Sequence, residues 1–270
     1  MAIMCLTSCN GAPGGTTLAV GLALSWPRPV LLVDADPGAH QSVLAGYLTG
    51  RSAGGKGLLR VAEAHRDRRP LREVVVDQCL SLVAADGAGP EGGGTTGDRR
   101  LFLPGFTKPT SAAHFAGVWE ELADTFERLG DVDVDVIVDL GRIGPLGLPA
   151  PLLERSALTA VVLRSDLRSV MSARVHLPTV VDPRVSTGPR GRTGLVLVDP
   201  GRPYPASEIG KALGLPVLAQ VAHDPVAAAH FSDGATQHRR FEASPLLRSI
   251  RNAASTFADA LQRSTALVRS

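Results

Sequence analysis

The chain contains 270 residues, 44% of them hydrophobic, with a formal net charge of +2, so it can bury a large core without a strong excess of either charge. Three cysteines without paired metal spacing argue against a secreted disulfide framework and indicate a reduced, cytoplasmic setting. No apolar run approaches the roughly 20 residues that cross a bilayer. The seven histidines lack zinc-ligand spacing, and no serine lies in a nucleophile elbow.

The first elements predict a strand, a glycine-rich loop and a helix. Residues 2–6 are apolar, residues 8–17 form the loop (Ser-Cys-Asn-Gly-Ala-Pro-Gly-Gly-Thr-Thr), and Leu18 and Leu22 then fall on one helical face. This order provides a phosphate cradle, because glycines let backbone N–H groups surround an anion at the positive end of the helix. An ordinary glycine turn is the alternative for the loop taken alone.

The loop lacks the lysine of a phosphate-binding motif. Against the pattern G-x-x-x-x-G-K-[ST], the frame runs from Cys9 to Gly14, Gly15 and Thr16, so Gly15 occupies the lysine position. Pro13 also removes one backbone N–H donor. None of the three lysines of the chain lies nearby in the sequence: they are Lys56, Lys108 and Lys211.

Two buried strands are predicted to end in carboxylates. Residues 30–33 are continuously apolar, as in a strand covered on both faces, and lead into Asp34 and Asp36. A second run, residues 134–140, contains Asp139 near its end. Ligands of an open α/β sheet collect beyond the carboxyl ends of its strands, so Asp36, Asp139 and the loop are expected to converge on one crevice. Strand-end capping or a salt bridge is the alternative role of Asp34 and Asp139.

The rest of the chain alternates apolar strands with helical segments. This alternation predicts one α/β domain over residues 1–270, with a three-layer, mostly parallel, doubly wound sheet flanked by helices. Residues 86–97 carry a second glycine motif without a following helix and are predicted to be a flexible Gly-rich loop. Residues 199–205 predict a proline-rich turn. Residues 244–264 predict a C-terminal helix that packs on the core, in preference to a membrane anchor.

Taken in order, these segments resemble the MinD/ParA group of deviant phosphate-loop ATPases. The hallmark of that group is K-G-G-x-G-K-[ST]-[ST] followed by a strand end V-D-x-D-P, and residues 10–17 and 33–37 match it in order and spacing apart from the lysines. The resemblance covers nearly the whole chain and continues through residues 102–105, 135–141, 158–163, 165–170, 212–218 and 232–234. It implies a P-loop NTPase-like fold and a homodimer.

The resemblance also implies a site for ATP or ADP with Mg²⁺. Thr16 and Asp139 match the positions that hold the metal, and Asp36 matches the catalytic position that orients the attacking water. An oxygen-only ligand set suits Mg²⁺. The implied nucleotide-binding positions are Asn10, Gly11, Ala12, Pro13, Gly14, Gly15, Thr16 and Thr17.

Two departures from the pattern weaken the implied enzyme. Asn10 stands where the group has the lysine that reaches the partner subunit's phosphates, and Gly15 stands where it has the lysine of the subunit's own site. Phosphoryl transfer depends on neutralising the charge of the transferred group, so weak or absent ATP hydrolysis is expected. Arg28 and Arg142 are the candidates for a cation supplied from outside the loop.

Two functions remain open. The first is a spatial positioning or regulatory protein with a degenerate nucleotide site that recruits protein partners, similar to the TadZ/CpaE-like branch that localises pilus or secretion machinery. The second is a slow, active ATPase in chromosome partitioning or division-site placement. Loss of both lysines favours the first, whereas retention of Thr16, Asp36 and Asp139 favours the second. Arginine clusters at residues 66–72 and 238–240 leave non-specific DNA binding open.

Overall fold

The computed structural model describes residues 3–9, 14–83, 99–129, 132–144, 147–181 and 192–269. The strands of this part of the chain form one sheet with the order β3-β4-β2-β5-β1-β6-β7-β8. All neighbouring strands pair in parallel except β3 and β4, which are antiparallel. The strands are β1 (Ile3–Ser8), β2 (Val30–Asp34), β3 (Leu80–Ser81), β4 (Arg100–Leu103), β5 (Asp135–Arg142), β6 (Ser156–Arg164), β7 (Arg192–Val198) and β8 (Val217–Val221).

The central strands are buried on both faces because they are continuously apolar. Strand β1 lies between β5 and β6, and β2 lies between β4 and β5, so each has hydrogen-bonded neighbours on both sides. Successive side chains alternate between the faces: Met4 and Leu6 pack on one side, and Ile3 and Cys5 on the other. Such strands are typical of parallel sheets covered by helices on both sides.

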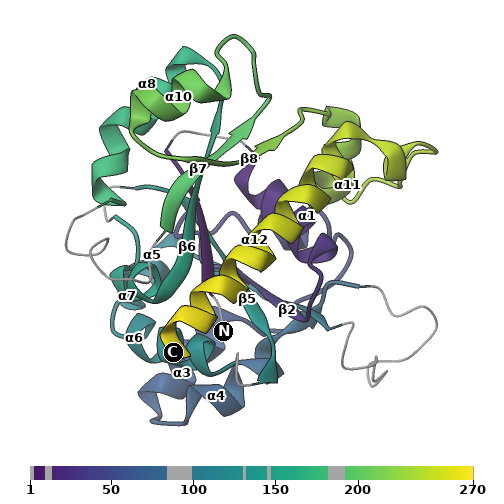
Figure 1. Ribbon diagram of the computed structural model, residues 1–270. Helices are drawn as coiled ribbons and strands as arrows, with labels where there is room; N and C mark the ends of the chain where they lie inside the picture. The colour runs from purple at the N-terminus through teal and green to yellow at the C-terminus, as the bar shows by residue number, and fades with distance from the viewer. Residues whose placement is uncertain are drawn as a thin grey trace.

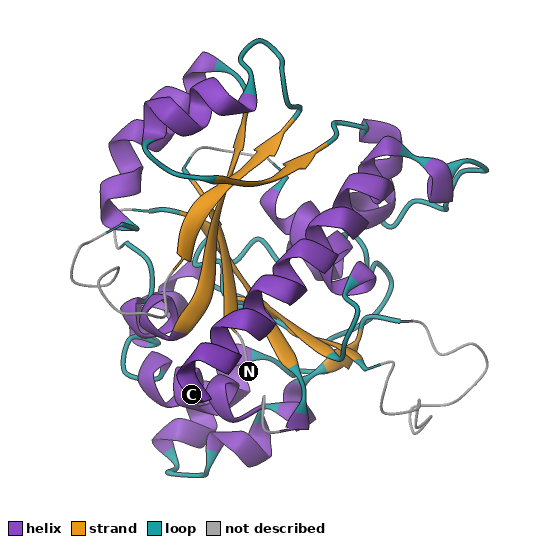
Figure 2. Cartoon of the chain, in the orientation of Figure 1, coloured by secondary structure: helices purple, strands orange, loops and turns teal. Residues whose placement is uncertain are grey.

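Helices cover both faces of the sheet and give three layers (Figure 1, Figure 2). This arrangement confirms the predicted α/β fold class. The helices of the first face are α1 (Gly15–Ser25), α2 (Ser42–Ala45), α11 (Pro225–Asp233) and α12 (Pro245–Arg269). Those of the second face are α3 (Leu58–Arg66), α4 (Leu71–Val74), α5 (Pro109–His114), α6 (Trp119–Leu129), α7 (Ala150–Arg155), α8 (Leu167–His176) and α10 (Ala206–Leu213). Short 3₁₀ helices are η1 (Val76–Gln78), η4 (Leu177–Thr179) and η5 (Phe241–Ala243).

Helix α12 runs across the first face and packs on α1 (Figure 1). Its side chains Ile250, Phe257 and Leu261 are buried in the same core as α1. Gly21 in α1 allows the close approach, because a Cβ atom there would lie 2.8 Å from Ile250 Cδ1. Within the described segments, every helix is too short or too polar to cross a membrane.

A polar network closes the N-terminal end of β5. Asp135 Oδ2 accepts hydrogen bonds from Trp26 Nε1 at 2.8 Å and from Arg28 Nε and Nη2 at 2.9 and 2.6 Å. Arg28 also donates to the Ala258 carbonyl of α12 at 3.2 Å. Asp139 lies four residues further along the strand, or about 13 Å at the usual rise. Arg28 is therefore engaged at the end of the sheet away from the loop and is not the cation that replaces the missing lysine.

Candidate functional site

Helix α1 starts at Gly15, a few residues after the carboxyl end of β1. Gly14 caps the helix with φ 85°, and its carbonyl accepts from the Leu18 N–H at 2.8 Å. Among the described residues, no side chain caps this terminus. A Cβ atom at Gly15 would meet no described atom within 4 Å, so the first carbon of a larger side chain fits there. The first four predicted nucleotide-binding residues, Asn10, Gly11, Ala12 and Pro13, lie outside the described residues.

The loop is joined to the neighbouring elements by hydrogen bonds. Ser172 Oγ of α8 donates to the Cys9 carbonyl at 2.8 Å, and Ile143 N donates to the Ser8 carbonyl at 2.9 Å. Thr7 Oγ1 donates to the Gly141 carbonyl at 3.0 Å. Burial raises the pKa of the Cys9 thiol to about 11, so this side chain is not a reactive thiolate. Strand β5 and helix α8 are thus both fixed to the chain that enters the loop.

Two buried carboxyl groups lie side by side at the ends of β2 and β5. Asp34 and Asp139 are partners in the parallel register, and both are buried. Burial, reinforced by the charge of Asp139, raises the pKa of Asp34 to about 8. Burial also raises the pKa of Asp139, while the nearby Thr16 hydroxyl and the Gly141 N–H oppose the rise. The ends of β2 and β5 therefore bring Asp34 and Asp139 together at one edge of the sheet.

Asp139 has one oxygen available for a further ligand. Its Oδ1 accepts from the Gly141 N–H at 3.0 Å, whereas Oδ2 is buried without a hydrogen-bond partner among the described residues. Such an orphaned carboxylate oxygen next to the Thr16 hydroxyl fits a hard cation, which prefers oxygen ligands. No cluster of three or more His, Cys, Asp or Glu side chains suited to a metal occurs in the described part of the chain.

Asp36 follows β2 and lies against the end of β5. A Cβ atom at Gly141, which has φ 63°, would lie 2.4 Å from Asp36 Cγ, so only glycine permits this approach. Asp36 Oδ1 accepts from the Gly38 N–H at 2.8 Å, and Asp36 Oδ2 lies 2.8 Å from His40 Nδ1. Both oxygens are therefore already engaged on the turn that carries them.

Sequence reasoning missed two residues of this arrangement. The spacing of the histidines argues only against a zinc site. It does not indicate that His40, four residues after Asp36, contacts the Asp36 carboxylate. Gly141 lies two residues after Asp139, near the end of β5. A glycine at such a position is a signal that another segment of the chain approaches closely. Arg142, the other candidate cation, is exposed at the end of β5.

As the pH rises, the Asp34→Asn variant is expected to lose less stability than the wild type. Since the pKa of Asp34 is raised from 3.8 to about 8, the native protein holds a proton that the unfolded chain releases, and stability falls as the pH rises between these values. Urea unfolding at about pH 5 and about pH 8 measures the effect. The wild type should lose more stability at the higher pH than Asp34→Asn, and equal losses would contradict the assignment.

The order and pairing of the strands and the helices on both faces match solved structures of P-loop NTPases. A ParA family ATPase from Chlorobium tepidum TLS is 19% identical, with a TM-score of 0.69 over 94% of this chain and 98% of that chain. A chain of the MinC:MinD cell division protein complex from Aquifex aeolicus is 15% identical, with a TM-score of 0.69 over 96% of both chains. The septum site-determining protein MinD from Pyrococcus horikoshii OT3, complexed with Mg-ADP, is 17% identical, with a TM-score of 0.60 over 95% of both chains.

The fold of this chain is therefore that of the MinD/ParA P-loop NTPases. No protein-family model and no curated protein matches the sequence. The likeness extends along almost the full length of the chain and of each of these three structures, so the arrangement of the elements is shared from end to end.

Proposed function

We propose that the protein is a MinD/ParA-like positioning or regulatory protein that binds a Mg-nucleotide and hydrolyses it slowly or not at all. The observation that carries the proposal is Gly15 at the open N-terminus of α1, beside Asp139 with its unpaired oxygen. The anion-binding amides and the acidic strand ends are retained. The cation that would neutralise the transferred phosphoryl group is missing from the loop.

Binding of a nucleotide is supported by the backbone and the oxygen ligands. The amides at the start of α1 attract phosphate through the partial positive charge of the helix terminus. Thr16 and Asp139 would hold Mg²⁺, and the ion, when bound, neutralises phosphate charge that the loop no longer offsets. The Pyrococcus horikoshii relative binds Mg-ADP, which agrees with the class of ligand proposed here.

Slow turnover is supported by the cations that the loop lacks. Asn10 and Gly15 stand at the two lysine positions, so the charge stabilisation of the transition state that these lysines would supply is lost. We propose that nucleotide acts on this protein chiefly as a bound ligand.

The outer face of α8 supports binding of a protein partner or of a second copy of the chain. Leu167, Met171 and Val175 lie one helical turn apart and are 57%, 50% and 68% exposed. Ser172 of the same helix donates a hydrogen bond to the Cys9 carbonyl at the start of the loop. A partner bound to α8 would therefore contact a helix that is hydrogen-bonded to the proposed nucleotide site. We propose a cytoplasmic homodimer with protein partners of a localised machine, such as pilus or secretion machinery.

The second candidate is a slow, active ATPase in chromosome partitioning or division-site placement. The retained Thr16, Asp36 and Asp139 favour it, because they match the positions that hold the metal and orient the attacking water. Phosphate release by the wild type and by Asp36→Ala separates the two candidates. Turnover that Asp36→Ala abolishes would decide for the ATPase, whereas equal background release agrees with the positioning protein.

Replacing Asp139 by asparagine is expected to weaken nucleotide binding in the presence of Mg²⁺ and to leave metal-free binding unchanged. The change removes the charge that would hold the metal, while the size of the buried side chain stays the same. Calorimetric titration with ADP, with and without Mg²⁺, measures both affinities. A magnesium effect of the same size in the wild type and in Asp139→Asn would contradict the assignment.

A further inference from the structure

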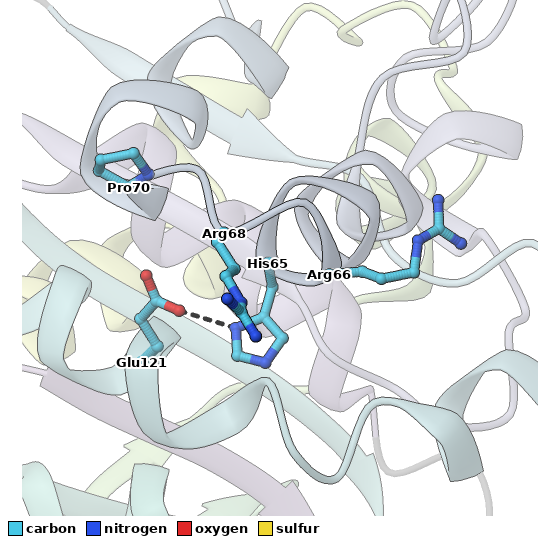
Figure 3. A pocket seen from close by; sticks show the side chains of 5 residues that line it. All are labelled: His65, Arg66, Arg68, Pro70 and Glu121. Atoms are coloured by element: carbon cyan, nitrogen blue, oxygen red, sulfur yellow. Dashed lines mark hydrogen bonds and ion pairs between the residues drawn. The ribbon is translucent and has the colours of Figure 1, made fainter.

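A cleft on the second face of the sheet lies between α3, the start of α4 and α6 (Figure 3). It has a volume of about 620 Å³ and is lined by His65, Arg66, Arg68, Pro70 and Glu121. A second cleft of about 190 Å³ shares two of these residues and adds Leu71, Arg72, Asp124, Thr125 and Arg128. The two clefts meet at Pro70 and Glu121, and we call them together the arginine cleft.

The arginine cleft lies away from the nucleotide site. Helix α3 starts beside the carboxyl end of β4, where Leu58 N donates to the Pro104 carbonyl at 2.9 Å. It then runs toward the opposite end of the sheet and ends at Arg66, where the cleft opens (Figure 1). A ligand in this cleft would therefore not compete with a nucleotide at α1.

The acidic side chains of the arginine cleft are already engaged within the protein. Glu121 Oε2 lies 2.7 Å from His65 Nδ1, and Glu121 Oε1 accepts from the Leu71 N–H at 3.5 Å. Asp124 Oδ1 accepts from Arg155 Nε at 2.8 Å. Asp124 is therefore offset by Arg155, and Glu121 is the one carboxylate of the lining without an arginine partner among the described residues.

The arginines themselves have weak partners. Arg66 and Arg72 each lie 3.6 Å from the carboxylate of the next residue, in pairs whose side chains are mostly exposed. Exposed pairs of this kind contribute little. For Arg68 and Arg128, the described part of the chain contains no ion pair within 4.0 Å. The cleft therefore keeps a positive charge that an anionic ligand would neutralise.

Arg68 has a backbone conformation that glycine would adopt with less strain. Its φ is 57°, and its N–H donates to the His65 carbonyl at 3.0 Å as α3 ends. Glycine is the residue usually found at such a left-handed helix end. Arg68 and His65 both line the cleft (Figure 3).

We propose that the arginine cleft docks an acidic peptide segment of a protein partner. Guanidinium groups bind carboxylates through paired N–H donors, and the exposed Pro70 gives the cleft an apolar part for the peptide's side chains. Glu121 and Asp124 interrupt the positive charge of the lining, which suits a short peptide better than the unbroken row of phosphates of duplex DNA. The inference goes beyond the proposed function and stands without the nucleotide site.

The test is fluorescence polarisation with a labelled peptide of alternating glutamate and alanine residues at low ionic strength. Arg68→Gly should weaken binding about fivefold, and Arg66→Ala combined with Arg68→Gly on the order of tenfold or more, as expected for exposed charge pairs. Arg239→Ala, which removes an equally exposed arginine outside the cleft, should leave binding unchanged. Arg68→Gly should unfold at the same or a higher urea concentration, so that lost binding is separated from lost folding.

Two results would overturn the proposal. Equal weakening by Arg239→Ala and Arg68→Gly would mean that the peptide responds to overall charge and not to the cleft. Tighter binding of a duplex oligonucleotide than of the peptide, with loss in Arg68→Gly, would assign the cleft to nucleic acid.

Discussion

Replacing Gly15 by lysine is expected to tighten binding of Mg-ADP by roughly tenfold to a hundredfold, or about 1.5 to 3 kcal/mol for one charge-assisted contact. The backbone tolerates the substitution, because a Cβ atom at Gly15 would meet no described atom within 4 Å and the residue does not have a positive φ. A lysine at this position of a phosphate loop reaches the β- and γ-phosphates. Calorimetric titration of both proteins measures the change.

Gly117→Lys is the matched control for this substitution. A Cβ atom at Gly117 also meets nothing within 4 Å, and the residue lies between α5 and α6, outside the loop. It adds the same charge, so it should leave the affinity nearly unchanged. If both lysines tightened binding equally, overall charge and not the loop position would be responsible. If neither did, the start of α1 would not be the phosphate site.

Replacing Asp135 by alanine is expected to destabilise the fold by about 3 kcal/mol, the lower part of the range for breaking a buried ion pair. The loss leaves Trp26 Nε1 without its acceptor and Arg28 without its counter-charge, because both donate to the same carboxylate oxygen. We take the lower part of the range because the Arg28 side chain is 25% exposed. The midpoint of urea unfolding measures the effect.

Glu242→Ala provides the comparison for that prediction. It also removes a carboxylate from an arginine, Arg251, but both side chains of this pair are more than half exposed. The expected change is below about 1 kcal/mol. Comparable losses in the two variants would show that the network at the start of β5 is not a particular source of stability.

The fold was predictable because its main signals are local. The continuous apolar run at residues 30–33 and the largely apolar run at 134–140 predict strands, and they form the neighbouring strands β2 and β5. The rule that strand ends meet at one edge then predicted the approach of Asp36 and Asp139. The turn predicted at residues 199–205 is also present. Residues 86–97, predicted as a loop, lie outside the described residues.

The details of the candidate site depend on tertiary contacts that sequence patterns do not encode. Arg28 is two residues from Trp26, but only the folded sheet brings both to Asp135, more than a hundred residues later. The contact of His40 with Asp36 depends on the conformation of the turn after β2. The strain at Arg68 likewise appears only in the backbone. Each of these features depends on the folded backbone and not on a local sequence pattern.

Calorimetric titration of the unmodified protein with Mg-ATP, followed by phosphate release from the same mixture, tests the central claim most directly. The claim is that the pocket keeps the shape of a nucleotide site without the cations that drive catalysis. We expect a measurable binding heat with phosphate release no faster than that of Asp36→Ala. No binding heat at millimolar nucleotide, or rapid release that Asp36→Ala abolishes, would contradict it.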